Sequence, residues 1–213
     1  ASGSFDLRWF TPAREVPLCG HATLASAFVL FEEGFHPTDQ PIVFNTLSGK
    51  LIVTKNQDET FSMDFPASIP SSSDMAIDKL EEVFGGKVQE VLTVQGELIV
   101  IFDELSTLLN IAPNTDNIAD LAENGVIVSA WSGSEAYDFA SRYFAPNLGI
   151  KEDPVTGFMH TILTPYWAKQ KDKSMFKAYQ ASARSGELLL ELKGDRVIIT
   201  GKAVKVFETT FKF

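Results

Sequence analysis

The stretch Arg8-Trp9-Phe10-Thr11-Pro12 decides the fold, because it returns further along the chain as Arg142-Tyr143-Phe144-Ala145-Pro146. Each copy has the form of a strand end closed by a proline. After a loop, each leads to a histidine at the start of an apolar helical stretch, His21 in the first case and His160 in the second. Strand, loop, histidine and apolar helix recur in the same order. This predicts a duplicated fold in which each of two related halves wraps strands around one central helix.

The composition limits the classes of partner. The chain has 213 residues, with 18 Lys+Arg, 28 Asp+Glu and a formal net charge of −10. Nucleic acid requires clustered Lys and Arg, and an anionic membrane surface has the same requirement. The basic residues are scattered, apart from a short interrupted run at 169–173. No apolar run is long enough to span a bilayer. We therefore expect neither a nucleic-acid partner nor a membrane partner.

The single cysteine and the absence of certain motifs limit the expected location of the protein and its expected cofactors. Cys19 is the single cysteine, which excludes an internal disulfide and a thiolate zinc cluster. The first residues lack the charged and apolar regions of a signal peptide, so the cytoplasm is the expected location. Glycine-rich phosphate loops and the esterase elbow are absent. No spacing supports a metal site, so we expect no cofactor and no metal.

The hydrophobic pattern predicts a mixed α+β chain. Helices are expected over 19–33, over 77–84 with Asp74 as its cap, near 115–123 and from 156 onward. The segment 66–74 is rich in Pro and Ser and is the expected linker. We accordingly place one half at residues 1–73 and the other at 74–213, with the last strand returning to the first half. Strands are expected at 7–11, 42–45, 50–55, 61–65, 88–94, 98–102, 126–131, 137–144, 176–182, 187–192, 196–200 and 204–211.

Two of the three histidines stand at helix starts, and we expect the third, His36, to face solvent. A helix N-terminus exposes unpaired N–H groups and partial positive charge. This environment disfavours imidazolium, so His21 and His160 are expected to be neutral and able to exchange protons near neutral pH. The same N–H groups suit a substrate carboxylate. The alternative is that both histidines only cap or pack the helices.

Two further residues allow a structural and a functional interpretation. In Glu152-Asp153-Pro154-Val155-Thr156-Gly157, Asp153 or Thr156 is a candidate helix cap. Alternatively, Asp153 is a carboxylate at the mouth of a site, within reach of proton transfer. Cys19 at a helix N-terminus is either a base or nucleophile of lowered pKa, or a buried small apolar residue.

These motifs together strongly resemble the phenazine biosynthesis PhzF-like family. The resemblance covers the chain from about residue 5 to its end. It rests on Leu7–Pro12, Glu15–Ala25, Arg142–Pro146 and Glu152–Gly157, and it includes Thr46-Leu47-Ser48-Gly49 and the segment Gln180-x-Ser182-x-Arg184-Ser185-Gly186.

The resemblance implies the diaminopimelate epimerase-like fold, with the active site in the cleft between its halves. It implies a cofactor-independent isomerase that shifts a proton on a small carboxylic acid, and a homodimer. His21 and Asp153 are the implied catalytic residues. The implied substrate-binding residues are Gly20, Cys19, Thr156, Gly157, His160, Ser48 and Arg184.

Three departures from the family pattern affect the expectation. Members begin with a further segment, in which the Glu of a Ser-Glu-Thr-Ala-Phe-like motif is the principal acid/base, and the chain starts just before Leu7. The first half is therefore expected to be incomplete. We expect that a partner chain covers the exposed face of the first helix or that the sequence is a fragment. Phe158 stands where the family usually has a substrate-binding Ser, and Ser185 stands where it often has Gly. The alternative function is a non-catalytic small-molecule-binding or interaction protein that kept the fold.

Overall fold

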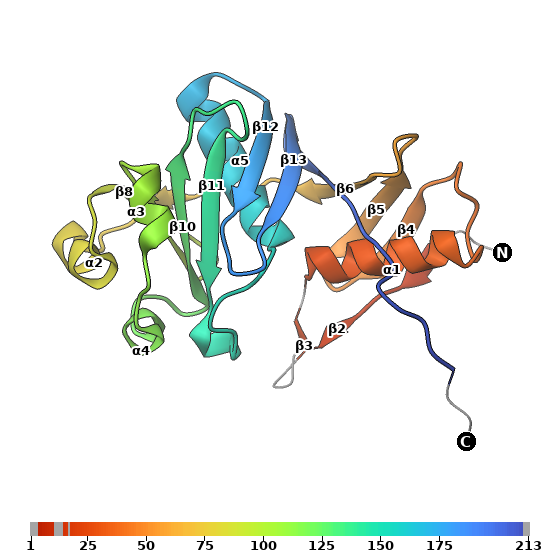
Figure 1. Cartoon of the computed structure of the whole chain (residues 1–213), viewed down its shortest axis with the longest axis horizontal. Coiled ribbons are helices and arrows are strands. Elements are labelled where there is room, and N and C mark those ends of the chain that lie inside the picture. The colour runs from red at the N-terminus through yellow and green to blue at the C-terminus, as the bar shows by residue number, and fades with distance from the viewer. Residues whose placement is uncertain (1–3, 11–14, 17, 211–213) are drawn as a thin grey trace.

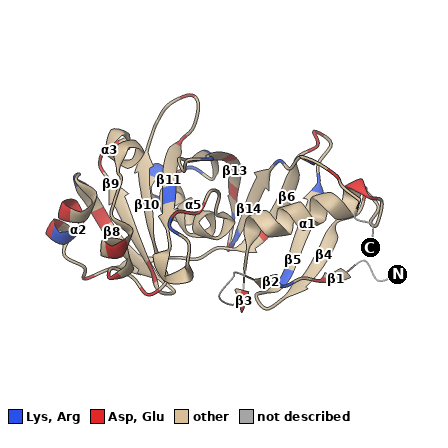
Figure 2. Cartoon of the chain, turned by 60° about the horizontal axis from the view of Figure 1, so that its bottom comes forward, with Lys and Arg blue, Asp and Glu red and all other residues tan. Residues whose placement is uncertain are grey.

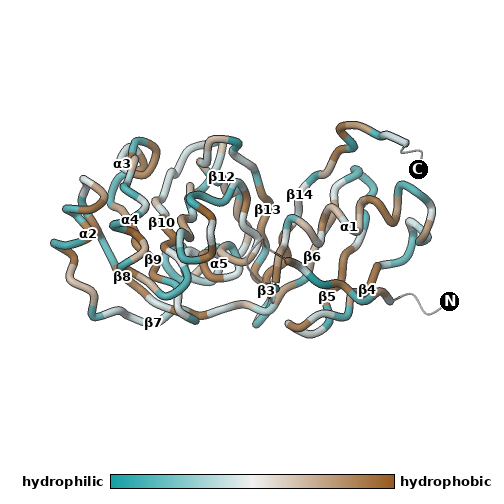
Figure 3. The backbone as a smooth tube through the Cα atoms, turned by 90° about the horizontal axis from the view of Figure 1, so that it is seen from below, coloured by the Kyte–Doolittle hydropathy of each residue, from teal (hydrophilic) through white to brown (hydrophobic). Residues whose placement is uncertain are grey.

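The structure is a computed structural model that describes residues 4–10, 15, 16 and 18–210. The sequence positions Thr11, Pro12 and Phe211, at which predicted strands end, lie outside these residues. Figure 1 shows an elongated molecule with helix α1 (Gly20–Glu32) in one part and helix α5 (Gly157–Lys171) in the other. The view from below separates the same two helices (Figure 3). The predicted mixed α and β architecture with two central helices is confirmed.

Twelve strands form one sheet in the order β1-β4-β5-β6-β14-β13-β12-β11-β10-β9-β8-β7. A separate small hairpin pairs β2 (Trp9–Phe10) with β3 (Glu15–Val16). The strands of the large sheet are β1 Ser4–Asp6, β4 Ile42–Thr46, β5 Gly49–Lys55, β6 Phe61–Pro66, β7 Ser71–Ser72, β8 Val88–Val94, β9 Glu97–Phe102, β10 Gly125–Trp131, β11 Phe139–Phe144, β12 Met175–Gln180, β13 Gly186–Lys193 and β14 Arg196–Gly201.

Strand β14 joins the two parts of the sheet. It pairs antiparallel with β13 on one side and with β6 on the other. Arg196 at its start donates from Nε to Oδ1 of Asp64 at 2.8 Å, which adds a charged hydrogen bond to the backbone ladder. The sheet is therefore continuous between the strands around α1 and those around α5. The division of the chain at residue 73 stays a prediction.

Two cores lie on opposite faces of the second part of the sheet. The inner core joins α1 and α5 to the strands and contains large buried side chains such as Phe61, Phe139 and Trp167. The outer core lies under the short helices α2 (Ile77–Phe84), α3 (Leu105–Asn110) and α4 (Thr115–Ala119). Strands β9 and β10 are almost continuously buried because they contact both cores.

A proline in the middle of α5 is accommodated by the expected linker. Pro165 has no N–H, so the carbonyl of Thr161 lacks its usual helical donor. The backbone N–H of Ser68 donates to that carbonyl at 3.0 Å. The segment between β6 and β7 is therefore fastened to the central helix of the second part, and it is more than a connecting linker.

The sequence repeat is also a repeat of interactions. Arg8 forms a bidentate ion pair with Glu15, and its guanidinium carbon lies 5.0 Å from the ring centre of Phe10. Arg142 forms the same bidentate pair with Glu152, and its guanidinium carbon also lies 5.0 Å from the ring centre of Phe144. Similar strand ends thus fold in the same way in both parts.

Several local predictions are wrong. His36 is buried, with only 6% of its surface exposed, because it packs edge-on against the rings of Phe5 and Phe31. Asp74 does not cap α2, whose N-cap is Ala76 and has no side-chain hydrogen bond. The helix ends at Gly85, which has a left-handed conformation. Residues 204–210 form no strand.

One predicted strand and one predicted helix have other bounds in the structure, and one helix was not predicted. The strand predicted over 7–11 is reduced to β2 in the described residues, and β1 precedes it. Helix α4 ends at Ala119, four residues before the predicted end. Helix α3 had no prediction, because its six residues are too few to show a helical period.

Candidate active site

A cavity of about 640 Å³ lies where the N-termini of α1 and α5 meet. Both parts of the molecule contribute to its wall. The residues of its wall that the sequence singled out are Cys19, Gly20, His21, Ser48, Asp153, Thr156, Gly157 and Phe158. The structure therefore brings together most of the predicted site residues, which belong to two groups, 19–48 and 153–158, that lie more than 100 positions apart in the sequence.

The two helix N-termini touch through their glycines. A Cβ atom on Gly20 would lie 3.0 Å from Cα of Gly157, and a Cβ atom on Gly157 would lie 3.2 Å from Cα of Gly20. Real Cβ atoms rarely approach other atoms this closely, and here the neighbour is backbone, which cannot turn away. Glycine at both positions is what allows the two first turns to lie side by side.

Neither helix has a side-chain cap. The N-cap residues Cys19 and Thr156 make no capping hydrogen bond, and no acidic residue stands in the first turn of α1 or α5. The structural interpretation of Asp153 or Thr156 as a cap is therefore wrong. Two uncapped first turns beside one cavity provide N–H groups and partial positive charge for an anion.

Asp153 is held in the cavity wall by a buried turn. The hydroxyl of Thr156 donates to Oδ2 of Asp153 in a short hydrogen bond. Gln180, which is completely buried, accepts from the backbone N–H of Thr156 at 2.6 Å and donates to the carbonyl of Asp153 at 2.8 Å. Burial raises the pKa of Asp153, while the Thr156 hydrogen bond and the positive charges of His21 and Arg184 partly offset it.

His21 is more basic than its place at a helix start suggests. Nδ1 lies 3.1 Å from the carbonyl oxygen of Val155, and Sγ of Cys19 lies 3.6 Å from Nε2. The hydrogen bond with Cys19 is the main cause that raises the pKa of His21 to about 9, and the negative charge of Asp153 adds to it. This raised pKa favours the imidazolium form at neutral pH, against the expectation of a neutral His21.

Three predicted residues lie at the edge of the site or behind it. Ser48 lines the cavity from the turn between β4 and β5. Arg184 is exposed and acts on Asp153 through its charge. His160 is completely buried; its Nδ1–H donates to the carbonyl of Thr156 at 2.8 Å, and its other nitrogen lies 3.3 Å from Ser141 Oγ.

The expected substrate contact of His160 therefore needs correction. Burial lowers the pKa of His160 to about 4, so the ring is neutral at physiological pH. Because its hydrogen bond goes to the N-cap residue of α5, His160 can affect the cavity by fixing Thr156. The position of His160 fits the alternative in which a histidine at a helix start only packs the helix.

Comparisons with known proteins match this chain over almost its whole length. The model of the family described as phenazine biosynthesis-like protein matches residues 1–209. The chain belongs to the PhzF-like family. An uncharacterized isomerase of Pseudomonas aeruginosa is 45% identical over 94% of this chain and 75% of its own length. Another, from Halalkalibacterium halodurans, is 40% identical over 96% of this chain and 77% of its own length.

Solved structures confirm the PhzF-like and epimerase-like fold. A crystal structure of a PhzF family protein of Enterococcus faecalis has a TM-score of 0.86 at 40% identity, and the match covers 95% of this chain and 76% of that one. A probable proline racemase of Agrobacterium radiobacter has a TM-score of 0.59 at 13% identity, over 92% of this chain and 68% of that one. The second match shows the fold alone.

The PhzF-like cavity also contains polar residues that the sequence analysis did not assign to the site. Glu97, Tyr143, Gln95 and Asn124 form one part of its wall. Glu97 is the first residue of the apolar strand β9, and a charged residue at the end of a strand is ordinary in a sequence. Its burial depends on the neighbouring strands β10 and β11, whose pairing no local pattern reveals.

The described residues contain no group of three or more His, Cys, Asp or Glu placed to hold a metal ion. Within the same ranges, no helix has the length and apolar character needed to cross a bilayer. Figure 2 shows Lys and Arg in separate short segments, interspersed with acidic ones. The absence of nucleic-acid and membrane partners stays a prediction.

Proposed function

We propose that this chain catalyses a cofactor-independent proton shift on a small carboxylic acid bound where α1 and α5 meet. The observation that carries the proposal is the contact between the two uncapped helix N-termini, at Gly20 and Gly157, beside a cavity that also contains His21 and Asp153. The family membership supports an isomerase, and the substrate is a proposal from the chemistry of the cavity.

The charges of the site suggest a division of roles. The N–H groups of both first turns bind the substrate carboxylate. Asp153 removes a proton from a carbon activated by that carboxylate, and the electron pair of the broken C–H bond spreads into the substrate. The imidazolium of His21 returns a proton to a different carbon, which gives the isomer. Proton exchange between the two side chains, or with water, restores the starting state.

Deuterium incorporation tests the proposal. Protein dialysed against a chelator is incubated in D2O with 3-butenoate, L-alanine and L-proline, and deuterium at carbon is followed by NMR. We expect exchange with at least one acid, and Asp153→Asn is expected to lower its rate by about 100-fold or more, which is the usual contribution of a general acid or base. The control Asp120→Asn changes an exposed residue at the end of α4 and is expected to leave the rate unchanged.

A second candidate function follows from Phe158. Its phenyl ring lines the cavity at the start of α5 and offers no hydroxyl to a ligand. This favours the alternative of a binding protein without catalysis. Calorimetric binding of one of the three acids, with no deuterium incorporation into it, would support the binding protein and contradict the isomerase.

We also propose a cytoplasmic homodimer. The proposal rests on the family resemblance and on a single cysteine among 213 residues. Light scattering at micromolar concentration is expected to give twice the chain mass, and a monomer would contradict the dimer. Fractionation of cells that produce the chain tests the compartment.

A further inference from the structure

A buried carboxyl group in the cavity wall has no role in the proposed mechanism. Glu97 is the first residue of β9, lines the cavity and has only 4% of its surface exposed. Its Oε1 accepts a hydrogen bond of 3.0 Å from the hydroxyl of Tyr143. Its Oε2 is buried and accepts no hydrogen bond of ordinary geometry from the described residues. An unpaired buried carboxyl oxygen is costly, and here it belongs to a side chain that lines a cavity.

The neighbouring strand is built to hold Tyr143 against this glutamate. Gly125 stands opposite Glu97 in the pairing of β10 with β9. A Cβ atom on Gly125 would lie 2.7 Å from the carbonyl oxygen of Phe144 and 2.8 Å from the ring of Tyr143, so a side chain here would displace the strand or the ring. The glycine leaves the space through which Tyr143 reaches the carboxyl group.

The hydrogen bond fixes the place of the proton. Because Tyr143 donates to Oε1, the neutral form of Glu97 carries its own proton on Oε2. Burial is the main cause that raises the pKa of Glu97 to about 7, against the opposing effects of Tyr143 and the Gly125 backbone. The charged and neutral forms are therefore both populated near neutral pH, as a group that both takes and gives protons requires.

We propose that Glu97 is a further proton-exchanging group of the cleft, beside Asp153 and His21. A rotation of its side chain turns the buried Oε2 toward the cavity, where this oxygen takes a proton from a carbon of the bound acid or returns one to it. The inference rests on the proposed function. In the step, a substrate C–H bond breaks, its proton passes to Oε2 and its electron pair remains on the substrate; the reverse step forms the new C–H bond. Tyr143 is a positioning residue that holds the other oxygen.

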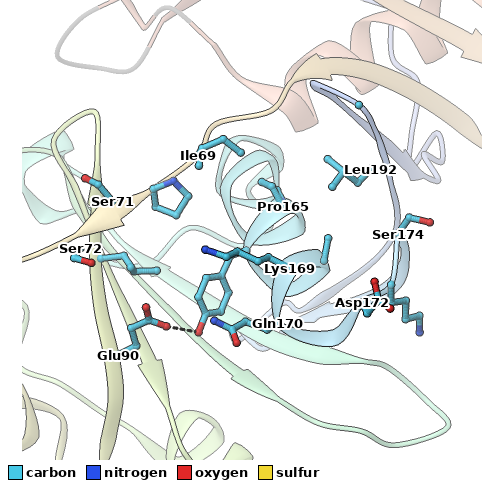
Figure 4. Close-up of a pocket in the computed structure, with 16 residues that line it drawn as sticks. Ile69, Ser71, Ser72, Glu90, Pro165, Lys169, Gln170, Asp172, Ser174 and Leu192 are labelled. Atoms are coloured by element: carbon cyan, nitrogen blue, oxygen red, sulfur yellow. Dashed lines mark hydrogen bonds between the residues drawn. The ribbon is translucent and has the colours of Figure 1, made fainter.

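A second glutamate provides a matched control. A separate cavity of about 750 Å³ is lined by Glu90, whose Oε2 accepts a hydrogen bond of 2.8 Å from Tyr166 (Figure 4). Tyr166 and Pro165 lie on α5, and Ser71 belongs to the edge strand β7. The tyrosine–glutamate hydrogen bond is thus the same in both cavities, but Glu90 is only half-buried and lies away from the uncapped helix N-termini.

The main experiment compares Glu97→Gln with Glu90→Gln in the deuterium assay. Glutamine has nearly the same shape as glutamate and can accept from the tyrosine, but it cannot exchange a proton. We expect Glu97→Gln to lower the rate constant kcat of exchange by at least about 100-fold, and Glu90→Gln to change it by less than about twofold. Tyr143→Phe is expected to lower kcat less than Glu97→Gln does, with little change in KM, and to shift the pH profile. An unchanged rate in Glu97→Gln overturns the proposal.

A measurement without turnover separates this inference from the proposed function. In protein labelled with 13C at the glutamate carboxyl carbon, the resonance that Glu97→Gln removes is expected to titrate with a midpoint near pH 7. Addition of 3-butenoate is expected to move that midpoint. If the wild type exchanges none of the three acids, the proposed function fails for them. A midpoint that does not respond to 3-butenoate, or no titration between pH 5 and 9, overturns the role of Glu97.

Discussion

Arg142→Ala is expected to lower the free energy of unfolding by about 2–4 kcal/mol, since it leaves a partly buried carboxylate without its counterion and a backbone carbonyl without its donor. The Arg142 side chain is only 12% exposed and that of Glu152 is 22% exposed. The guanidinium also donates to the carbonyl of Ile111 at 2.6 Å, which ends helix α3. Urea denaturation followed by tryptophan fluorescence measures the change.

The first copy of the repeat is the control for this prediction. Arg8 makes the same pair with Glu15 and the same contact with a phenylalanine ring, but its side chain is 64% exposed. Water screens exposed ion pairs, so Arg8→Ala is expected to leave the urea midpoint unchanged. Equal losses in the two variants would show that burial does not decide the effect.

Gln180→Leu is expected to cost about 3–5 kcal/mol of unfolding free energy and to reduce exchange at the active site. Leucine has a similar size, so it leaves little empty space. It leaves the backbone N–H of Thr156 and the carbonyl of Asp153 buried without partners, each at about 1–3 kcal/mol. The turn that holds Asp153 is then no longer fixed. Urea denaturation and the deuterium assay measure the two effects.

The matched control is Gln89→Leu on strand β8, where the glutamine is exposed. This variant is expected to change neither the unfolding free energy beyond about 0.5 kcal/mol nor the exchange rate. If Gln180→Leu were as stable as the wild type, the buried hydrogen bonds around Thr156 would not hold the turn.

The sequence predicted the parts of the fold that local patterns encode. The helices at Gly20–Glu32 and Gly157–Lys171 are confirmed because their apolar residues recur over several turns. The strands of the apolar runs, such as β9, are confirmed for the same reason. Predictions failed where the outcome depends on contacts between distant segments: His36 looks polar in its loop, but two phenylalanine rings enclose it.

The candidate site was predictable only in part. The family resemblance implied that Gly20, His21 and Asp153 lie beside one cleft, and the structure brings them to one cavity. The basicity of His21 could not be predicted, because it depends on the rotation of Cys19 and on the distance to the charge of Asp153. Glu97 was missed because its burial comes from the pairing of three strands.

The pairing of β14 with β6 sets an order on folding during synthesis. Ile198 pairs with Asp64, a separation of 134 residues (198 − 64) along the chain. A ribosome adds about 5–20 residues per second, so β6 has an open edge for several seconds to half a minute before its neighbour exists. The unpaired N–H and C=O groups of an open strand edge can pair with other chains. The nascent chain is therefore most exposed to aggregation in its first half, and a chaperone that binds β6 until β14 emerges would raise the yield of folded protein.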